Sequence, residues 1–407
     1  MKRRVVITGM GIWSCIGQSL EAVTENLKQG YSGIVYDHNI INFGLQSGLT
    51  ANVPTPKLKT LLPREYRAAM SLDAQYAYMA ALQAFEQADI TASYLQSNVI
   101  GCIFGGDGNW EEIENIKNVE EKHSSSEVDL FSFIRFNASN SSLILSMLFH
   151  LKGVEFCVGA ACASGSHAIG IGKMFIESGM SDILLVGGSC PVQLGTATAV
   201  DNLGVISLRN NDPQHASRPF DRDRDGMIPS GGAAALVLEE YEHAMARGAN
   251  ILAEVIGYGF SSNGIEDISM SSADGEYQAM KRALDDAGLK PEDIDYVNAH
   301  ATSTIQGDIE EAKALTRLFR NKPWISSTKS MTGHENWMAG ASEAVYSILM
   351  MQNNFVAPNI NLENVIDEAK DLRIARETIY TPVNTVLSNS SGMGGTNSAL
   401  VFRRLQQ

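Results

Sequence analysis

The chain has 407 residues, of which 44% are hydrophobic and 19% charged, enough apolar sequence for two or three structural units or one large duplicated fold. Its 46 acidic and 31 basic residues give a net charge of −15, and no basic block appears, which argues against a nucleic-acid binder. The longest apolar runs fall short of the roughly 20 residues of a membrane span, and five cysteines without paired spacing favour a reducing, cytoplasmic setting.

The first half of the chain alternates short β-branched or apolar runs with longer stretches of helical spacing, which predicts buried strands joined by helices. Residues 5–8 follow a basic start, but glycines break the apolar run soon after, so we expect a first strand rather than a signal peptide. Further strands are expected at 99–103, 155–158, 183–186 and 233–239, and helices at 72–88, 143–151 and 163–178. Residues 109–129 are predicted to form a polar surface excursion, and 210–225 a long ordered loop.

A second series of the same kind follows. Strands are expected at 253–258, 296–298, 385–388 and 399–402, and helices at 276–287, 308–319 and 339–351. Two successive series predict a duplicated α/β fold with a largely buried sheet in each half. We place the division within 241–250, with an N-terminal half of 1–245 and a C-terminal half of 246–407.

Cys162 follows the expected strand 155–158, at the start of the expected helix 163–178. A cysteine at this junction faces the positive end of the helix dipole, which favours thiolate over thiol. The turn also offers a backbone N–H to a developing oxyanion beside the sulfur. A buried structural cysteine is the alternative, and placement alone leaves both interpretations open. We expect the other four cysteines to be packing residues.

Two histidines end segments rich in hydroxyls and small residues: His300 in NAHATST and His334 in STKSMTGH. Loops of this kind often present functional side chains, although each histidine taken singly is more often a hydrogen-bonded core residue. Their spacing and the scarcity of nearby acids do not resemble a zinc set, so we expect no metal.

The glycine-rich segment 388–397, SNSSGMGGTN, precedes the last expected strand. It is a weak match to a phosphate cradle because no helix with a Walker-type lysine follows. An ordinary tight turn and a loop that offers a second backbone donor near Cys162 both remain open.

Together and in this order, these segments resemble the β-ketoacyl-acyl-carrier-protein synthases, specifically the elongating enzymes with a Cys-His-His triad. The resemblance runs from VITGMG near the start to GGTN near the end. ACAS around Cys162 stands where the family has its nucleophile, and HATST and KSMTGH match its two histidine motifs. The resemblance implies a thiolase-like duplicated α/β fold with α-β-α-β-α layers.

The resemblance also implies an activity, the decarboxylative Claisen condensation of malonyl carrier protein with an acyl chain held on Cys162, as in fatty acid elongation. His300 and His334 then donate hydrogen bonds to the enolate, with Lys329 ordering them, and the backbone N–H groups of Cys162 and Met393 form the oxyanion hole. Four further residues take roles by resemblance, two supporting the histidines and two binding the pantetheine arm: Glu343 and Asp308, and Thr302 and Thr304.

Three motifs depart from the family pattern. The family's Phe-Gly-Phe-Gly-Gly reads SGMGG at 391–395, its Gly-His-x-x-Gly-Ala-Ala-Gly reads GHENWMAG at 333–340, and its His-Gly reads His-Ala at 300–301. We therefore expect a reshaped acyl pocket. The residues assigned to its wall and gate are Met393, Ser391, Trp337 and Met338.

The implied partner is an acyl carrier protein, loaded with an acyl or malonyl group on its phosphopantetheine arm, so no cofactor of the chain's own is expected. Arg64 and Arg67 roughly match the family's basic docking region. The family pairs two subunits through the strand before the cysteine, here 155–159, because an edge strand needs a partner. We expect a homodimer, or a heterodimer with a ketosynthase-like subunit.

Single residues distinguish this chain from related enzymes with other chemistries. A thiolase needs a second cysteine in the glycine-rich loop, which 388–397 lacks, and the initiating synthases carry asparagine where this chain has His334. Three alternatives stay open: the catalytic subunit of a heterodimer that makes a polyene or polyketide, a non-catalytic partner subunit in which Cys162 only packs, and a cysteine acyltransferase or hydrolase without decarboxylation.

Overall fold

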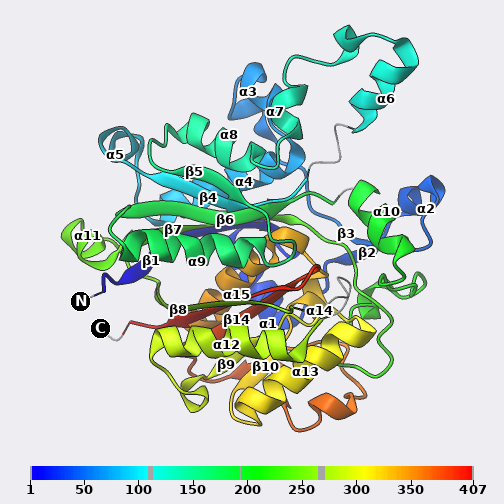
Figure 1. The fold of residues 1–407 in the computed structure, drawn as a ribbon, viewed down its shortest axis with the longest axis vertical. Coiled ribbons are helices and arrows are strands. Elements are labelled where there is room, and N and C mark those ends of the chain that lie inside the picture. Colours follow the sequence, from blue (N-terminus) through cyan, green and yellow to red (C-terminus); the bar gives the residue numbers. More distant parts are fainter. Residues whose placement is uncertain (1, 109–112, 193, 265–270, 406–407) are drawn as a thin grey trace.

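The computed structural model of the protein describes residues 2–108, 113–192, 194–264 and 271–405. It has two stacked sheet regions (Figure 1). A short pairing between one strand of each region links them into a single series of 11 hydrogen-bonded strands. The first region contains β5 (Glu155–Val158), β4 (Gly101–Gly105), β6 (Ile183–Cys190), β7 (Gly232–Glu240) and β1 (Val5–Ser14), in that spatial order. The second contains β12 (Arg373–Ile374), β10 (Trp324–Ser326), β9 (Tyr296–Asn298), β14 (Thr385–Gly392), β15 (Thr396–Arg403) and β8 (Ala253–Ser262).

The two sheet regions repeat one topology. Leaving out β12, each runs third, second, fourth, fifth and first strand of its own half. In each, the first three strands in space are parallel, the fourth runs antiparallel to them, and the fifth pairs antiparallel with the fourth. The expected duplicated α/β fold is therefore confirmed, while the boundary between residues 245 and 246 stays a prediction.

Helices cover the sheets in layers (Figure 1). The outer face of the first region carries α4 (Leu72–Gln87) and α8 (Asn140–Phe149), and the outer face of the second carries α12 (Ala273–Ala287) and α13 (Ile305–Phe319). Between the sheets lie α9 (Ser164–Glu177) and α15 (Ala339–Asn353). This arrangement is the α-β-α-β-α layering that the resemblance implied.

Shorter elements complete the chain. The helices are α1 (Leu20–Gln29), α2 (His38–Phe43), α3 (Arg64–Ala68), α5 (Ala92–Ser97), α6 (Ile113–Lys122), α7 (Ser132–Phe136), α10 (Leu194–Asn202), α11 (Tyr241–Ala246) and α14 (Lys329–Thr332). Two small sheets pair β2 (Ile34–Tyr36) with β3 (Leu49–Ala51), and β11 (Phe355–Val356) with β13 (Ile379–Tyr380). Of the expected excursion at 109–129, residues 109–112 lie outside the described residues, and α6 projects from the body of the fold (Figure 1).

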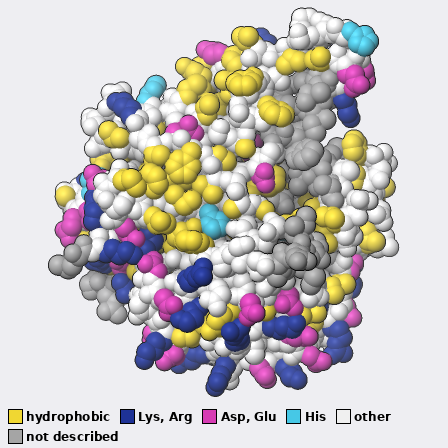
Figure 2. Space-filling model, viewed as in Figure 1, with side chains coloured by type: hydrophobic (Ala, Val, Ile, Leu, Met, Phe, Trp, Pro, Cys, Tyr) yellow, Lys and Arg dark blue, Asp and Glu magenta, His cyan; other side chains and the backbone are white. Residues whose placement is uncertain are grey.

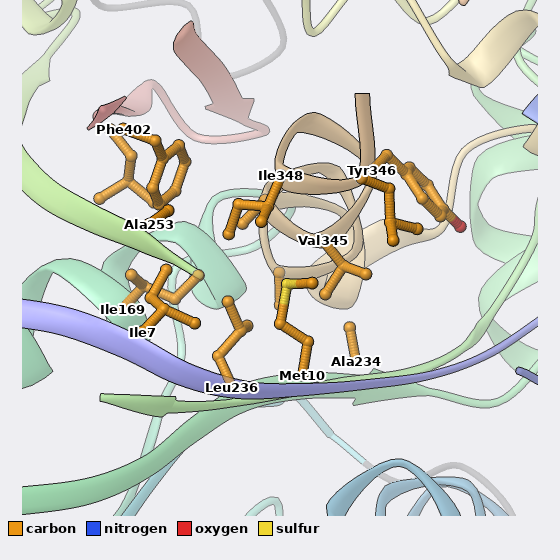
Figure 3. Packing of buried hydrophobic residues seen from close by; sticks show 14 of the residues in the cluster. Ile7, Met10, Ile169, Ala234, Leu236, Ala253, Val345, Tyr346, Ile348 and Phe402 are labelled. Carbon is orange, nitrogen blue, oxygen red and sulfur yellow. The ribbon is translucent and has the colours of Figure 1, made fainter. Parts of the chain in front are cut away.

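The central helix α15 holds the two sheets together. Every residue from Ala339 to Met351 is buried, as expected of a helix enclosed on all sides. Figure 3 shows Val345 and Ile348 of this helix lying between Met10 of the first sheet and Phe402 of the second, and all four side chains are fully buried. The core on which the site rests is thus shared by both halves.

The first strand is longer than the sequence predicted. We expected it to end where Gly9 and Gly11 interrupt the apolar run, but β1 continues to Ser14. A Cβ on Gly9 would lie 2.1 Å from the carbonyl oxygen of Ala84, and one on Gly11 would lie 1.9 Å from that of Ala80. These glycines therefore let α4 approach the strand closely instead of ending it.

Candidate active site

Cys162 lies in a tight turn between β5 and α9. Ala161 before it has a φ of 46°, in the left-handed region that residues with a Cβ rarely adopt. The Ser164 hydroxyl accepts the N–H of Ala160 at 2.8 Å and donates to the carbonyl of Ala161 at 2.6 Å. The turn is thus held by hydrogen bonds in a strained shape that sets the direction of the sulfur.

The three predicted triad residues come together. Nε2 of His334 lies 3.0 Å from Sγ of Cys162, across 172 positions of sequence. The rings of His300 and His334 are 5.3 Å apart between centroids and nearly perpendicular. Within the described residues, Nδ1 of each ring has no hydrogen-bond partner.

The backbone holds His334 in place. Its N–H donates to the carbonyl of Ile228 at 2.7 Å, and its own carbonyl accepts the N–H of Ser230 at 2.9 Å. Gly333 has a φ of 70°, and a Cβ on it would lie 2.8 Å from the Ile228 carbonyl oxygen. Glycine is therefore required before this histidine for both reasons.

The Cys162 thiol does not have the lowered pKa that its place at a helix end led us to expect. Burial raises the pKa of this thiol above its ordinary value, although the backbone N–H groups of Met393 and Cys162 and the charge of Lys329 lower it. Cys162 also precedes the first residue of α9 by two positions, where the dipole acts less directly. The same two N–H groups are those assigned to the oxyanion hole, and that assignment stays a prediction.

Lys329 and Glu343 form a buried ion pair behind the histidines. Their side chains are 1% and 0% exposed, and Nζ of the lysine contacts Oε1 of the glutamate. Burial raises the pKa of Glu343 to about 7, while the lysine lowers it. Burial first, and the lysine charge second, hold the pKa of His300 and of His334 well below the usual range. Both imidazoles are therefore neutral near pH 7 and carry one N–H each.

Glu311 of α13 is a site residue that sequence reasoning missed. Its carboxylate accepts the N–H of His300 at 2.8 Å, the N–H of Ala301 at 2.6 Å and the side-chain amide of Asn389 at 2.8 Å. It fixes the backbone that carries the first histidine. The available signal was its position three residues after Asp308, which puts both carboxyl groups on one face of a helix.

Asp308 itself does not contact either histidine. It accepts the N–H of Phe220 at 2.8 Å and that of Ser303 at 3.1 Å, and it lies 3.5 Å from Nε of Arg224. Burial raises its pKa to about 7. Its position supports the loop after His300 and ties the loop at 210–225 to it.

A cavity of about 400 Å³ opens onto Cys162, His300 and His334. Thr302 and Thr304 lie along it with their hydroxyl oxygens 3.1 Å apart. Other residues assigned from sequence that line it are Ser391, Met393 and Trp337. The Met393 side chain is 49% exposed at the turn between β14 and β15, whereas Trp337 is only 8% exposed.

Three assigned residues lie elsewhere. Met338 is fully buried in the core beside α15 and does not line the cavity. The short helical turn at 336–338 directs it away from the cavity that Trp337 lines. Arg64 is exposed at the start of α3, and Arg67 is half-buried with Nε donating to the carbonyl of Leu62 at 3.2 Å. Of this pair, Arg64 is the more exposed residue.

None of the helices in the described ranges combines the length and the apolar character needed to cross a bilayer. In the same ranges, no three side chains of His, Cys, Asp or Glu are placed to hold a metal ion. That the chain needs no metal or cofactor stays a prediction.

This site suits a condensing enzyme. It places a cysteine beside two neutral histidines, with two backbone N–H groups near the sulfur, on a duplicated thiolase-like fold. Comparison with known families agrees. Residues 2–244 match the N-terminal domain of beta-ketoacyl synthase and residues 252–363 match its C-terminal domain. The chain therefore belongs to the β-ketoacyl synthase family.

Individual relatives are similar over their full lengths. The chain is 38% identical to 3-oxoacyl-[acyl-carrier-protein] synthase 1 of Escherichia coli K12 over 411 residues, covering 99% of this chain and 100% of the relative. A beta-ketoacyl synthase from Burkholderia phymatum STM815 superposes with a TM-score of 0.94 at 35% identity, covering 99% of this chain and 100% of the other. A type II PKS acyl-carrier protein in complex with its ketosynthase gives a TM-score of 0.88 at 28% identity, with both chains covered fully.

Proposed function

We propose that the protein is a 3-oxoacyl-acyl-carrier-protein synthase that condenses malonyl carrier protein with an acyl chain held on Cys162, in fatty acid elongation. The observation that carries the proposal is the 3.0 Å contact between Cys162 and His334, with the His300 ring beside it, in one cavity. The name of the full-length Escherichia coli relative supports the substrate class.

In the first step Sγ of Cys162 attacks the thioester carbon of the acyl carrier protein. The thiol proton passes to Nε2 of His334, 3.0 Å away, and then to the leaving pantetheine sulfur. The raised pKa of the thiol makes this base necessary. The N–H groups of Cys162 and Met393 stabilise the oxyanion of the tetrahedral intermediate.

In the second step the malonyl group loses CO2, and the electron pair of the broken C–C bond moves into an enolate. Neutral His300 and His334 each have one N–H to donate to the enolate oxygen, and His334 does so as the tautomer with its proton on Nε2. The enolate carbon then attacks the acyl carbon, and Cys162 leaves as thiolate. Thr302 and Thr304 hold the pantetheine arm along the cavity.

We further propose a carrier protein docked at Arg64, with its arm entering past Met393. Support comes from the exposure of both side chains and from the solved complex of an acyl-carrier protein with its ketosynthase. Ser391 and Met393, in place of two phenylalanines, and Trp337 would set the accepted acyl chain. A Trp337→Gly, Met393→Phe variant with unchanged chain preference would contradict this assignment.

A homodimer and a cytoplasmic location belong to the same proposal. In the described chain β5 ends its sheet with β4 as its one strand neighbour. Hydrophobic side chains gather on the face over β5 and α9 (Figure 2). Met174 of α9 is 50% exposed. An open strand edge beside apolar area favours pairing with a second copy.

The test uses the purified protein with acyl and malonyl carrier proteins and weighs the products. We expect a β-ketoacyl product and an acyl adduct on Cys162, both lost in Cys162→Ala and kept in the matched control Cys157→Ala. Free fatty acid in place of the ketoacyl product would identify a hydrolase. No adduct and no product from the folded wild type would identify a non-catalytic subunit.

A further inference from the structure

One carboxyl group in the catalytic cavity has no role in the mechanism above. Glu276 lies in the first turns of α12, and its side chain lines the cavity that contains Cys162, His300 and His334. The residue is only 2% exposed, and its Oε2 has no hydrogen-bond partner among the described residues. An unpaired buried carboxyl oxygen is costly, so a ligand that pairs with it gains binding energy.

Two neighbours locate Glu276 within the cavity. The charge of Glu311, which holds the backbone of His300, acts on the Glu276 carboxyl group, and so does the hydroxyl of Ser391, two residues before the N–H of Met393. Glu276 is therefore near the place where a thioester must sit to reach both the histidines and the oxyanion hole. The Ser391 hydroxyl also lacks a partner of good geometry within the described chain.

Glu311 and Glu276 differ in how well the protein stabilises a negative charge on each carboxyl group. Burial raises the pKa of Glu311, but three hydrogen bonds from two backbone N–H groups and an amide, together with the charge of Lys329, oppose that rise. Glu276 receives no comparable set, and burial together with the Glu311 charge raises its pKa well above the usual range. Glu276 thus enters the reaction as a neutral carboxylic acid with an O–H to donate.

We propose that the Glu276 carboxylic acid and the Ser391 hydroxyl form a subsite for the carboxylate of the malonyl extender unit, an inference that rests on the proposed function. The extender is an anion at this end, and the subsite offers two neutral donors to it. The pairing holds the carboxylate until the C–C bond breaks. CO2 leaves without a proton, the electron pair enters the enolate, and Glu276 keeps its proton throughout.

Loss of this subsite should affect decarboxylation of malonyl carrier protein but not acylation of Cys162, because the acyl substrate has no carboxylate. With Glu276→Ala we expect kcat/KM for decarboxylation of malonyl carrier protein to fall about tenfold or more, mainly through KM, as for one hydrogen bond to a charged group. Acylation of Cys162 by acyl carrier protein, followed by mass spectrometry, should be unchanged. Glu276→Gln keeps an N–H donor and should stay within about threefold of wild type.

Two further variants complete the experiment. Ser391→Ala should raise the malonyl KM by about threefold. Glu292→Gln, an exposed acid outside the cavity, should change neither half-reaction. The inference is overturned if Glu276→Ala decarboxylates normally, if Gln and Ala lose activity equally, or if both half-reactions fall together. Failure of wild type to take an acyl group on Cys162 would instead refute the proposed function.

Discussion

Comparing a single Lys329 variant with a double variant of Lys329 and Glu343 should separate the two effects of their buried ion pair. The lysine stabilises a carboxylate that has no exposure, and its charge lowers the pKa of both catalytic histidines. Lys329→Met removes both effects at once. The double variant Lys329→Met/Glu343→Leu removes the same charge without leaving a buried acid unpaired.

The expected magnitude follows from burial. Removing one partner of a buried pair costs about 3–5 kcal/mol, whereas replacing both with apolar residues is often neutral or better. The loss in Lys329→Met should shrink at low pH, because the orphaned Glu343, with a pKa already raised to about 7, takes up a proton instead of remaining charged. The folded-state pKa is raised, so this contribution to stability is present at low pH and is lost as pH rises.

The assay is urea unfolding at pH 6 and pH 8 alongside the pH profile of the condensation rate. We expect the single variant to be less stable, most of all at pH 8, and the double variant to recover most of the loss. In both variants the acid limb of the rate profile should move to higher pH, because the histidines protonate more easily without the lysine. Equal stability of the two variants, or an unmoved acid limb, would refute the reasoning.

Three other predictions test single contacts. Glu311→Ala leaves buried donors on the backbone of His300 unpaired, at about 1–3 kcal/mol each, so the melting temperature should fall and malonyl decarboxylation should suffer more than acylation of Cys162. Burial raises the pKa of Glu335 to about 8. Its contribution to the free energy of unfolding should therefore fall as pH rises from about 4.5 to 8. In urea unfolding, the free-energy difference between wild type and Glu335→Gln should change with pH over the same range. Arg64→Glu should raise KM for the acidic carrier protein, and added salt should no longer weaken binding at this contact, because it now screens a repulsion. Rates with a small acyl thioester should stay unchanged.

The alternation of apolar runs and helical spacing predicted most of the buried elements of the fold. It failed where strands are short or rich in glycine. Trp324–Ser326 is three residues long and carries no periodic signal, yet it pairs on both sides as β10 in the second sheet. Gly9 and Gly11 looked like breaks, because the need for glycine comes from α4 packing on β1, a contact between distant parts of the chain.

The sequence predicted the reacting residues of the site and the supporting pair Lys329 and Glu343, but it missed two further carboxyl groups. Motifs around Cys162, His300 and His334 carry local signatures, and the structure brings them into contact. Glu311 and Glu276 carry no motif, and their importance arises from which backbone groups and which cavity they meet. The ionisation of the sulfur was wrongly predicted for the same reason, because sequence indicates a helix end but not the depth of burial.

The duplication explains why residues so far apart converge. In each half the third strand of the sheet ends in a functional turn: β5 leads to Cys162, and β10 leads through α14 to His334. The second and fourth strands of the C-terminal half add His300 and the Met393 turn. Parallel strands present their carboxyl ends at one edge of a sheet, and α15 fixes the two sheets face to face. The N-terminal half therefore supplies the nucleophile, and the C-terminal half supplies the two histidines and the Met393 N–H donor. Loosening the packing of α15 should therefore lower activity before it unfolds either sheet, since the contact between Cys162 and His334 spans the two halves.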